Sequence, residues 1–324
     1  MEARDCSSIF RHCLSVKKEG DSYFPVRFSR ELLKFYEGLD EGKAVRAHSC
    51  AGITMEFMTD AEEISFEYRS IAFCRPMVVF DFFENDVLMG TVREPDNSEK
   101  GKVTYIRQIK GRGKVTVYLP YCVHMTFQNL KLGQWEVCGQ QEKKILFLGD
   151  SITQGMTVIH PSQSFANLTA RLLGMDWINQ GVGGYIFHKD SLTDVEKIQA
   201  DLIFVAYGTN DYFQVSEGNM TLETFFQNMT GYLSTLKEKA GKTEIAVISP
   251  LWREDCVSIE DKKLFDQISQ WILESCHKLG LKCMDGRTLV GHEGELLADG
   301  LHPNDMGANM MALNMEANLR KWGL

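Results

Sequence analysis

The spacing of apolar residues changes once along this chain, near residue 140, and the change predicts two different kinds of fold. Between about residues 44 and 138, apolar and polar residues alternate in short runs, as at 53–57. Alternation with a period of two is typical of strands with one buried face. Turn-forming residues, as at 110–113, separate the runs. Roughly seven or eight such strands predict an antiparallel β-sandwich of the jelly-roll type.

Beyond residue 140, short apolar strands alternate with longer helical patterns. We expect strands at 144–148, 176–179, 201–206, 244–249 and 281–285, and helices at 162–173, 221–239, 258–279 and 304–322. This alternation predicts an α/β fold with a parallel sheet covered by helices on both faces. The predicted domains are therefore a β-sandwich at 1–140 and an α/β domain at 141–324.

Two helices carry more specific expectations. Residues 29–38 predict a short helix that Ser29 caps. In the helix at 304–322, apolar residues recur at helical spacing, and we expect them to face the core; they are Met306, Met310, Leu313 and Ala317.

Length and charge limit the classes of partner. With 324 residues, 44% of them hydrophobic, the chain exceeds the usual size of one domain. Its net charge of −9 and pI of about 5.5 argue against binding to nucleic acid or to an acidic membrane. Both of those partners attract clustered Lys and Arg. The oligomeric state stays open.

The cysteines and the N-terminus bear on location. The nine cysteines are scattered, odd in number and without a C-x-x-C pair, which predicts reduced thiols and no zinc site. No long apolar stretch follows residues 1–6, and no run reaches transmembrane length. We therefore expect a cytoplasmic protein, although secretion stays open if the sequence is a mature form.

Four polar segments follow predicted strands of the second domain. The list is Gly149-Asp150-Ser151, Asn179-Gln180-Gly181-Val182-Gly183-Gly184, Gly208-Thr209-Asn210-Asp211 and Asp299-Gly300-Leu301-His302-Pro303. The first three come directly after a strand, and the fourth comes after the last strand and a loop. Ligands of such sheets bind at the carboxyl ends of the strands, so we expect the four segments to form one site.

The residue types in these segments are those of a serine nucleophile. Ser151 lies where a strand turns into a helix, and backbone N–H groups favour an anion there. Asp299, three residues before His302, is placed to orient its imidazole as a general base for Ser151. Such a base predicts that activity falls at acid pH.

Three groups are candidates to stabilise an oxyanion. They are the Ser151 N–H, the Asn210 side-chain amide and the Gly184 N–H, where the missing Cβ permits close approach. Gly183 competes with Gly184 for the last role. Taken alone, each of these segments is explained by a cap, a turn or a surface histidine. Their joint order along the chain favours an active site.

These segments resemble the conserved blocks of the SGNH hydrolases, also called GDSL-type esterases, over about residues 144–324. The resemblance implies a flavodoxin-like three-layer α/β/α domain that hydrolyses carboxylic esters without a metal or another cofactor. It implies Ser151, Asp299 and His302 as the catalytic residues. It also implies an oxyanion hole made of Ser151, Gly184 and Asn210.

A β-sandwich ahead of such a domain is similar to the arrangement in family-2-type carbohydrate acetyl esterases. That similarity implies a small-molecule or oligosaccharide ester as substrate, with acetyl as the acyl group. Tyr185 and Trp252 are candidates to line the substrate cleft, although core or interface packing is the favoured explanation of each.

Three other functions are weighed against this one. A lysophospholipase or thioesterase of the same superfamily needs an apolar channel for the acyl chain. A non-catalytic protein that binds carbohydrate through the sandwich does not need the full set of site residues. A phosphatase or dehalogenase-type enzyme is disfavoured, because the chain has no second Asp two residues after Asp150 and no phosphate-binding loop.

Overall fold

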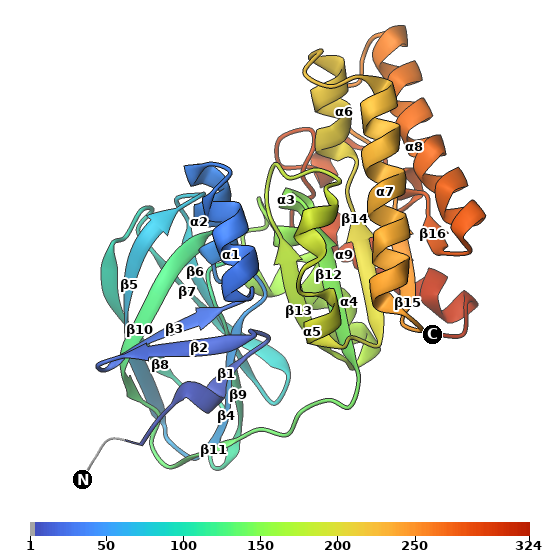
Figure 1. Cartoon of the computed structure of the whole chain (residues 1–324). Helices are drawn as coiled ribbons and strands as arrows, with labels where there is room; N and C mark the ends of the chain where they lie inside the picture. The colour runs from blue at the N-terminus through green and yellow to red at the C-terminus, as the bar shows by residue number, and fades with distance from the viewer. Residues whose placement is uncertain (1–3) are drawn as a thin grey trace. The chain divides into compact units, whose positions relative to one another are not determined.

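The computed structural model describes residues 4–324, and contacts divide the chain into two compact units (Figure 1). The first unit holds the residues up to 141 together with 160–162, and the second holds 142–159 and 163–324. Residues 1–3 belong to the N-terminal segment in which we expected no leader, and they lie outside the described residues.

The first unit contains two antiparallel sheets, which confirms the predicted β-sandwich. One sheet has the order β1-β4-β9-β6-β7 with β11 paired to β4, and the other has the order β2-β3-β10-β5-β8. The strands are β1 Phe10–Arg11, β2 Ser15–Glu19, β3 Ser22–Val26, β4 Thr54–Thr59, β5 Glu63–Phe73, β6 Val78–Glu84, β7 Val87–Glu94, β8 Lys100–Ile106, β9 Gly113–Tyr118, β10 Val123–Lys131 and β11 Trp135–Val137.

The sandwich core is built from the alternate residues that point inward. Phe57 on β4, Phe66 on β5 and Phe127 on β10 are at most 1% exposed. The sequence pattern did not reveal β1, β2 and β3, which precede residue 44, or β7 and β11. β2 and β7 lie at sheet edges, and most of their side chains are exposed or half-buried, so neither needs an apolar face.

Two helices connect β3 to β4. In α1, Arg30–Glu37, the Ser29 hydroxyl accepts a hydrogen bond of 3.3 Å from the Leu32 N–H, so the predicted cap is present. The second helix, α2, spans Glu41–His48 and begins at an Asp40 cap. The sequence did not reveal it, because Ala47 is its one buried residue and it has no apolar stripe.

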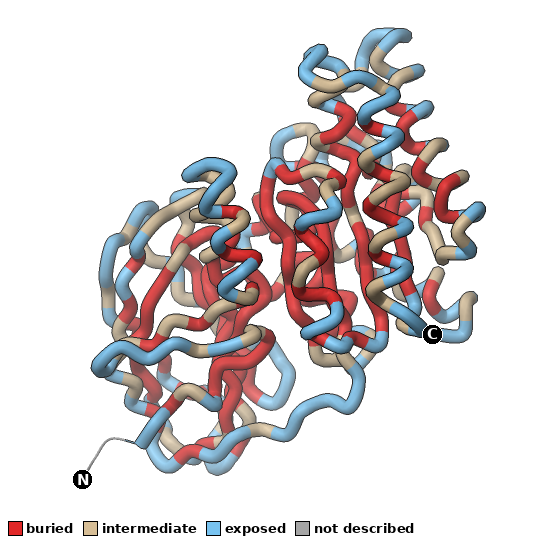
Figure 2. The backbone as a smooth tube through the Cα atoms, viewed as in Figure 1, coloured by how far each residue is buried: buried red, intermediate tan, exposed pale blue. Residues whose placement is uncertain are grey.

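The second unit has the predicted α/β fold. Its five strands are all parallel, in the order β13-β12-β14-β15-β16, which is the flavodoxin-like order. They are β12 Lys144–Gly149, β13 Asp176–Gly181, β14 Leu202–Ala206, β15 Glu244–Ile248 and β16 Lys282–Met284. Figure 2 shows β12 to β15 buried along nearly all of their length, while the edge strand β16 is mostly half-buried.

Helices cover both faces of this sheet (Figure 1). They are α3 Ser151–Gln154, α4 Phe165–Leu173, α5 Val195–Ile198, α6 Thr209–Ser216, α7 Leu222–Ala240, α8 Ile259–Leu279 and α9 Asp305–Lys321. Helices α4 and α9 pack together on one face, and α5, α7 and α8 lie on the other. Among residues 4–324, no helix is long and apolar enough to cross a membrane.

The predicted core face of α9 is wrong. Met306 and Leu313 are 67% and 56% exposed, and Met310 and Ala317 are also exposed. The helix instead buries Ala308, Met311, Ala312, Met315 and Leu319. Both faces of α9 carry apolar residues at helical spacing, and the smaller Ala308 and Ala312 allow close packing, which spacing alone does not reveal.

A buried ion pair lies inside the sandwich. Glu84 at the end of β6 and Arg107 after β8 are 3.3 Å apart, and their side chains are 0% and 1% exposed. Glu84 also accepts hydrogen bonds from the Tyr105 hydroxyl at 3.0 Å and the Gln108 N–H at 2.6 Å. Removing one member of such a pair leaves the other charge buried without compensation.

We predict that Glu84→Gln lowers the free energy of unfolding by about 3 to 5 kcal/mol, because it leaves the Arg107 charge unpaired. Chemical denaturation measures the change. The control is Arg112→Ala, which breaks an exposed 2.6 Å pair with Glu136. The control should cost less than about 1 kcal/mol. Equal losses in the two variants would contradict the prediction.

Candidate active site

Ser151 lies at the start of α3, directly beyond the carboxyl end of β12. Asp150 caps this short helix by accepting a 3.0 Å hydrogen bond from the Ile152 N–H. The helix fits closely against two strand ends. A Cβ at Gly149 would lie 2.0 Å from Thr153 Oγ1, and a Cβ at Gly181 would lie 2.4 Å from the Gln154 N. Glycine is therefore required at both strand ends.

The structure brings together the serine, histidine and aspartate that the sequence singled out. Ser151 Oγ lies 2.7 Å from His302 Nε2. His302 Nδ1 lies 3.0 and 2.9 Å from the two oxygens of Asp299. Ser151 is 6% and His302 is 9% exposed, so both lie in a largely dry environment.

The loop that carries Asp299 and His302 is held by its own backbone. The His302 N–H donates a 2.9 Å hydrogen bond to Asp299 Oδ1, and the Ala298 N–H donates one of 2.8 Å to the His302 carbonyl. Partial burial raises the pKa of Asp299. The hydrogen bonds from His302 and its positive charge outweigh burial, and the pKa is lowered overall. Asp299 is therefore held as an anion beside the imidazole.

Two backbone N–H groups are open to an oxyanion. Ser151 is the first residue of α3, so its N–H has no acceptor within the helix. Gly184 has a φ of +70°, and among the described residues its N–H has no hydrogen-bond partner. The Gly183 N–H instead donates to Gln154 Oε1 at 2.9 Å. This contact favours Gly184 over Gly183 as the donor.

Asn210, near the start of α6, points its amide toward the same region. Its Nδ2 lies 3.1 Å from Asp150 Oδ2 and 3.1 Å from the Tyr185 carbonyl oxygen. An amide nitrogen has two hydrogens, so both are engaged in this structure. To act on an oxyanion, the amide would have to exchange or share one of these bonds.

Two carboxyls beneath the site were not singled out as functional. Asp150 and Asp211 are 1% and 0% exposed. Burial raises the pKa of each carboxyl to about 7, against hydrogen bonds that lower it. Asp211 accepts from the Phe187 N–H at 3.2 Å and the Gly208 N–H at 3.1 Å. It thereby holds the loops that carry Tyr185 and Asn210.

Gln154 and Asn179 also support the site. Besides holding Gly183, Gln154 lies on the turn of α3 that meets the strand ends. Asn179 Nδ2 donates 2.7 Å to the Thr153 carbonyl, and its Oδ1 accepts 2.9 Å from the Gly181 N–H. Asn179 belongs to one of the four polar segments, and Gln154 lies three residues after Ser151. These positions were the available sequence signal for a supporting role, because buried amides need hydrogen-bond partners nearby.

The two aromatic candidates occupy different environments. Tyr185 is 5% exposed, and its ring centroid lies 6.2 Å from that of Tyr207. Trp252 is half-buried and stacks on His292 at 5.1 Å between ring centroids. Among the residues that the structure describes, no three His, Cys, Asp or Glu side chains gather where they could hold a metal ion.

Comparisons with known proteins point to one family. Residues 147–310 match the model of the GDSL-like Lipase/Acylhydrolase family. A search of the curated proteins finds no match.

Solved structures share the fold over both units of the chain. A salicylyl-acyltransferase from a tetracycline biosynthetic pathway is 18% identical with a TM-score of 0.78, covering 97% of this chain and 94% of its own. A family two carbohydrate esterase from Cellvibrio japonicus is 15% identical with a TM-score of 0.67, covering 98% and 96%. A family two carbohydrate esterase from Clostridium thermocellum, in complex with cellohexaose, is 15% identical with a TM-score of 0.61, covering 84% and 92%.

At these identities the solved structures show the shared fold, and the family assignment comes from the family model. That match spans just over half of the chain, from within β12 into α9. The span includes Ser151, Asn210 and His302. The chain therefore belongs to the GDSL-like lipase/acylhydrolase family.

Proposed function

We propose that the protein is a serine esterase that hydrolyses short acyl esters, with acetyl groups on carbohydrates as the preferred substrates. The observation that carries this proposal is the continuous hydrogen-bonded series Ser151–His302–Asp299, with distances of 2.7 and 2.9 Å. A serine hydroxyl bonded to an imidazole that a carboxylate orients is the arrangement of an activated nucleophile.

In the proposed mechanism, Ser151 Oγ attacks the ester carbonyl carbon while His302 Nε2 takes the hydroxyl proton. Asp299 stabilises the imidazolium that forms. The tetrahedral intermediate collapses, and His302 gives the proton to the departing alcohol. Water then attacks the acyl-enzyme with His302 as base, which releases the acid and restores Ser151.

The oxyanion of the intermediate would be held by the Ser151 and Gly184 N–H groups and by the Asn210 amide. Preorganised donors of this kind stabilise the charge that develops in the transition state. We propose that Asn210 Nδ2 turns one hydrogen from the Tyr185 carbonyl to the oxyanion and keeps its bond to Asp150. Asp150 would then act as a positioning residue for Asn210.

The likeness to two family two carbohydrate esterases supports a carbohydrate ester as the substrate class. The main alternative is a lysophospholipase or thioesterase, which would need a channel for a long acyl chain. The likeness to an acyltransferase adds a third outcome, in which an alcohol takes the acyl group in place of water. A non-catalytic carbohydrate-binding role is less favoured, because it does not require the Ser151–His302–Asp299 arrangement.

We retain Tyr185 and Trp252 as proposed substrate contacts.

We also propose a reducing, cytoplasmic location and domains at 1–140 and 141–324. All nine cysteines lie among the described residues, and all are free thiols. Free thiols are typical of proteins in reducing compartments.

The first test compares initial hydrolysis rates on aryl esters from acetyl to decanoyl and measures acetate release from acetylated sugars. We expect acetyl to be the fastest substrate and Ser151→Ala to lower turnover by several orders of magnitude, because the nucleophile is absent. Thermal unfolding of Ser151→Ala provides the control for folding.

Rates that rise with chain length would move the assignment to a lipid or thioester hydrolase. Transfer of the acyl group to an added alcohol, with little free acid, would indicate an acyltransferase. Near-wild-type activity of Ser151→Ala would remove the proposed nucleophile.

The second test concerns Asn210. We expect Asn210→Ala to lower kcat about 10²- to 10³-fold with a smaller change in KM, because an oxyanion donor acts mainly in the transition state. Steady-state kinetics on the acetyl ester measures both constants. A change confined to KM would assign Asn210 to ground-state binding.

The third test concerns Asp150, whose folded-state pKa of about 7 lies above its ordinary value of 3.8. A carboxyl whose pKa is higher in the folded state than in the unfolded state stabilises the fold. This contribution is complete when the pH lies below the unfolded-state pKa, and it is lost as the pH rises to about 7. The stability of Asp150→Asn relative to the wild type should therefore rise by a few kcal/mol between pH 4 and pH 7.5.

Urea denaturation at several pH values measures this difference, and Asp21→Asn, on an exposed turn, is the control. A difference between Asp150→Asn and the wild type that stays constant with pH would contradict the prediction. The variant should also lose activity across the range, since an Asn at 150 does not accept both the Ile152 and the Asn210 hydrogen bonds equally well.

A further inference from the structure

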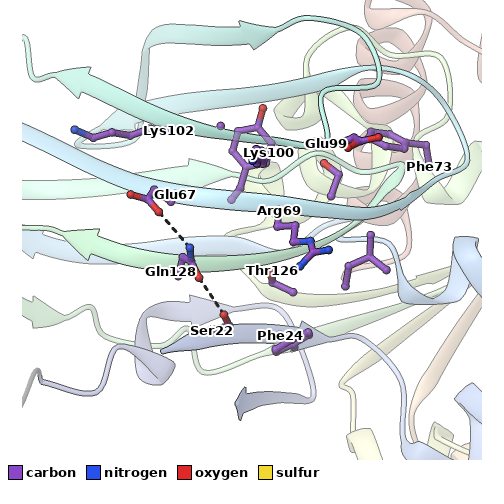
Figure 3. Close-up of a pocket in the computed structure, with 14 residues that line it drawn as sticks. Ser22, Phe24, Glu67, Arg69, Phe73, Glu99, Lys100, Lys102, Thr126 and Gln128 are labelled. Atoms are coloured by element: carbon purple, nitrogen blue, oxygen red, sulfur yellow. Dashed lines mark hydrogen bonds between the residues drawn. The ribbon is translucent and has the colours of Figure 1, made fainter. Parts of the chain in front are cut away.

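A groove crosses the outer face of the sheet formed by β2, β3, β10, β5 and β8, entirely within the first unit. Its volume is about 1380 Å³, above the roughly 300 to 1,000 Å³ of pockets for small ligands. The residues that line it come mostly from β3, β5, β8 and β10 (Figure 3). The esterase proposal uses none of these residues.

The register of the strands arranges the lining side chains in two rows across the sheet. In one row, Gln128 lies opposite Glu67, and Glu67 lies opposite Lys102. In the other row, Thr126 lies opposite Arg69, and Arg69 lies opposite Lys100. Successive residues of a strand alternate between the faces of a sheet, so both rows point away from the core.

The first row is a ladder of polar groups that hydrogen-bond to one another. Ser22 Oγ donates to Gln128 Oε1 at 3.2 Å, and Gln128 Nε2 donates to Glu67 Oε2 at 3.2 Å (Figure 3). Asn129 Nδ2 adds a 2.8 Å bond to Glu67. The hydrogen bonds from the Asn129 and Gln128 side-chain amides lower the pKa of Glu67. The carboxylate in this row is therefore already stabilised by hydrogen-bond donors.

The second row holds two cations in direct opposition. Arg69 and Lys100 are exposed, and among residues 4–324 neither side chain has a hydrogen bond or an ion pair. Like charges that face each other across a sheet are unfavourable. Glu99 also lines the groove, and Lys102 faces Glu67. An anion between Arg69 and Lys100 would turn this repulsion into attraction.

Apolar surface lies next to these cations. Ile71 is 49% exposed, and Phe24 and Phe73 are half-buried in the wall of the groove. Aromatic rings offer flat faces to the C–H faces of sugar rings, while the polar ladder offers donors and acceptors to hydroxyl groups. A planar guanidinium pairs with a carboxylate through two parallel hydrogen bonds.

We propose that this groove is a second binding site, separate from the esterase site, for an oligosaccharide that carries carboxylate groups. Arg69 and Lys100 bind a carboxylate, the Ser22–Gln128–Glu67 ladder binds hydroxyls, and the apolar residues contact ring faces. The net charge of −9 opposes general attraction of polyanions, so retention of an acidic ligand needs a local site.

The test is isothermal titration of the full chain, carrying Ser151→Ala, with an α-1,4-linked galacturonate hexamer. Cellohexaose serves as the neutral ligand and a glutamate hexapeptide as the acidic non-sugar ligand. Ser151→Ala prevents turnover, and binding in the groove does not require the proposed esterase activity. The two proposals therefore succeed or fail separately.

We expect the acidic hexamer to bind at least about tenfold more tightly than either comparison ligand. Arg69→Gln should weaken its binding by at least about tenfold, and Arg69→Lys should restore part of the affinity, because it keeps the charge without the fork of donors. The matched control is Lys131→Gln, an equal charge change on β10 outside the groove, which should stay within about twofold.

Equal binding of cellohexaose would overturn the role of the carboxylate, and equal binding of the peptide would overturn the choice of a saccharide. Absence of binding, or unchanged binding by Arg69→Gln with an unaltered melting temperature, would overturn the site. In the chain that keeps Ser151, Arg69→Gln should leave hydrolysis of an aryl acetate unchanged.

Discussion

The close fit of α3 against the ends of β12 and β13 is the constraint on which the site depends. Gly149 and Gly181 leave no room for a Cβ, because the first turn of α3 occupies that space. This contact fixes where Ser151 emerges and where its N–H points. Asn179 strengthens the fit by bonding the Thr153 carbonyl. A side chain at either glycine would displace the nucleophile and the oxyanion donor together.

The order of the parallel strands gathers the other groups around Ser151. β13 and β14 flank β12, so the loops after three adjacent strands carry Gly184, Ser151 and Asn210. His302 comes from a distant part of the chain. A bridge between Leu297 and Pro303 closes its loop on itself, so Asp299 meets the imidazole without help from another element. Local backbone bonds thus orient the base, and the sheet orients the nucleophile.

Buried polar groups support these loops at a cost to stability. Asp150 and Asp211 lie in an environment that favours their neutral forms, as the raised pKa of each carboxyl shows. They persist because each accepts hydrogen bonds that hold a functional loop, Asp150 from Asn210 and Asp211 from Phe187 and Gly208. The sandwich also buries polar groups, as in the Glu84–Arg107 pair, while its groove residues lie on an exposed sheet face.

The sequence by itself determined the two kinds of unit, the five parallel strands and the segments that hold the candidate site, because periodicity and strand-end motifs are local properties. It did not determine which face of α9 is buried, since Met306 and Met311 suit a core equally well and only packing against α4 selects between them. Nor did it reveal that Gln154 occupies the Gly183 N–H, that Asn210 bonds Asp150, or that Arg69 faces Lys100. Those pairs join residues far apart in the chain, so only the tertiary structure, through strand order and register, decided them.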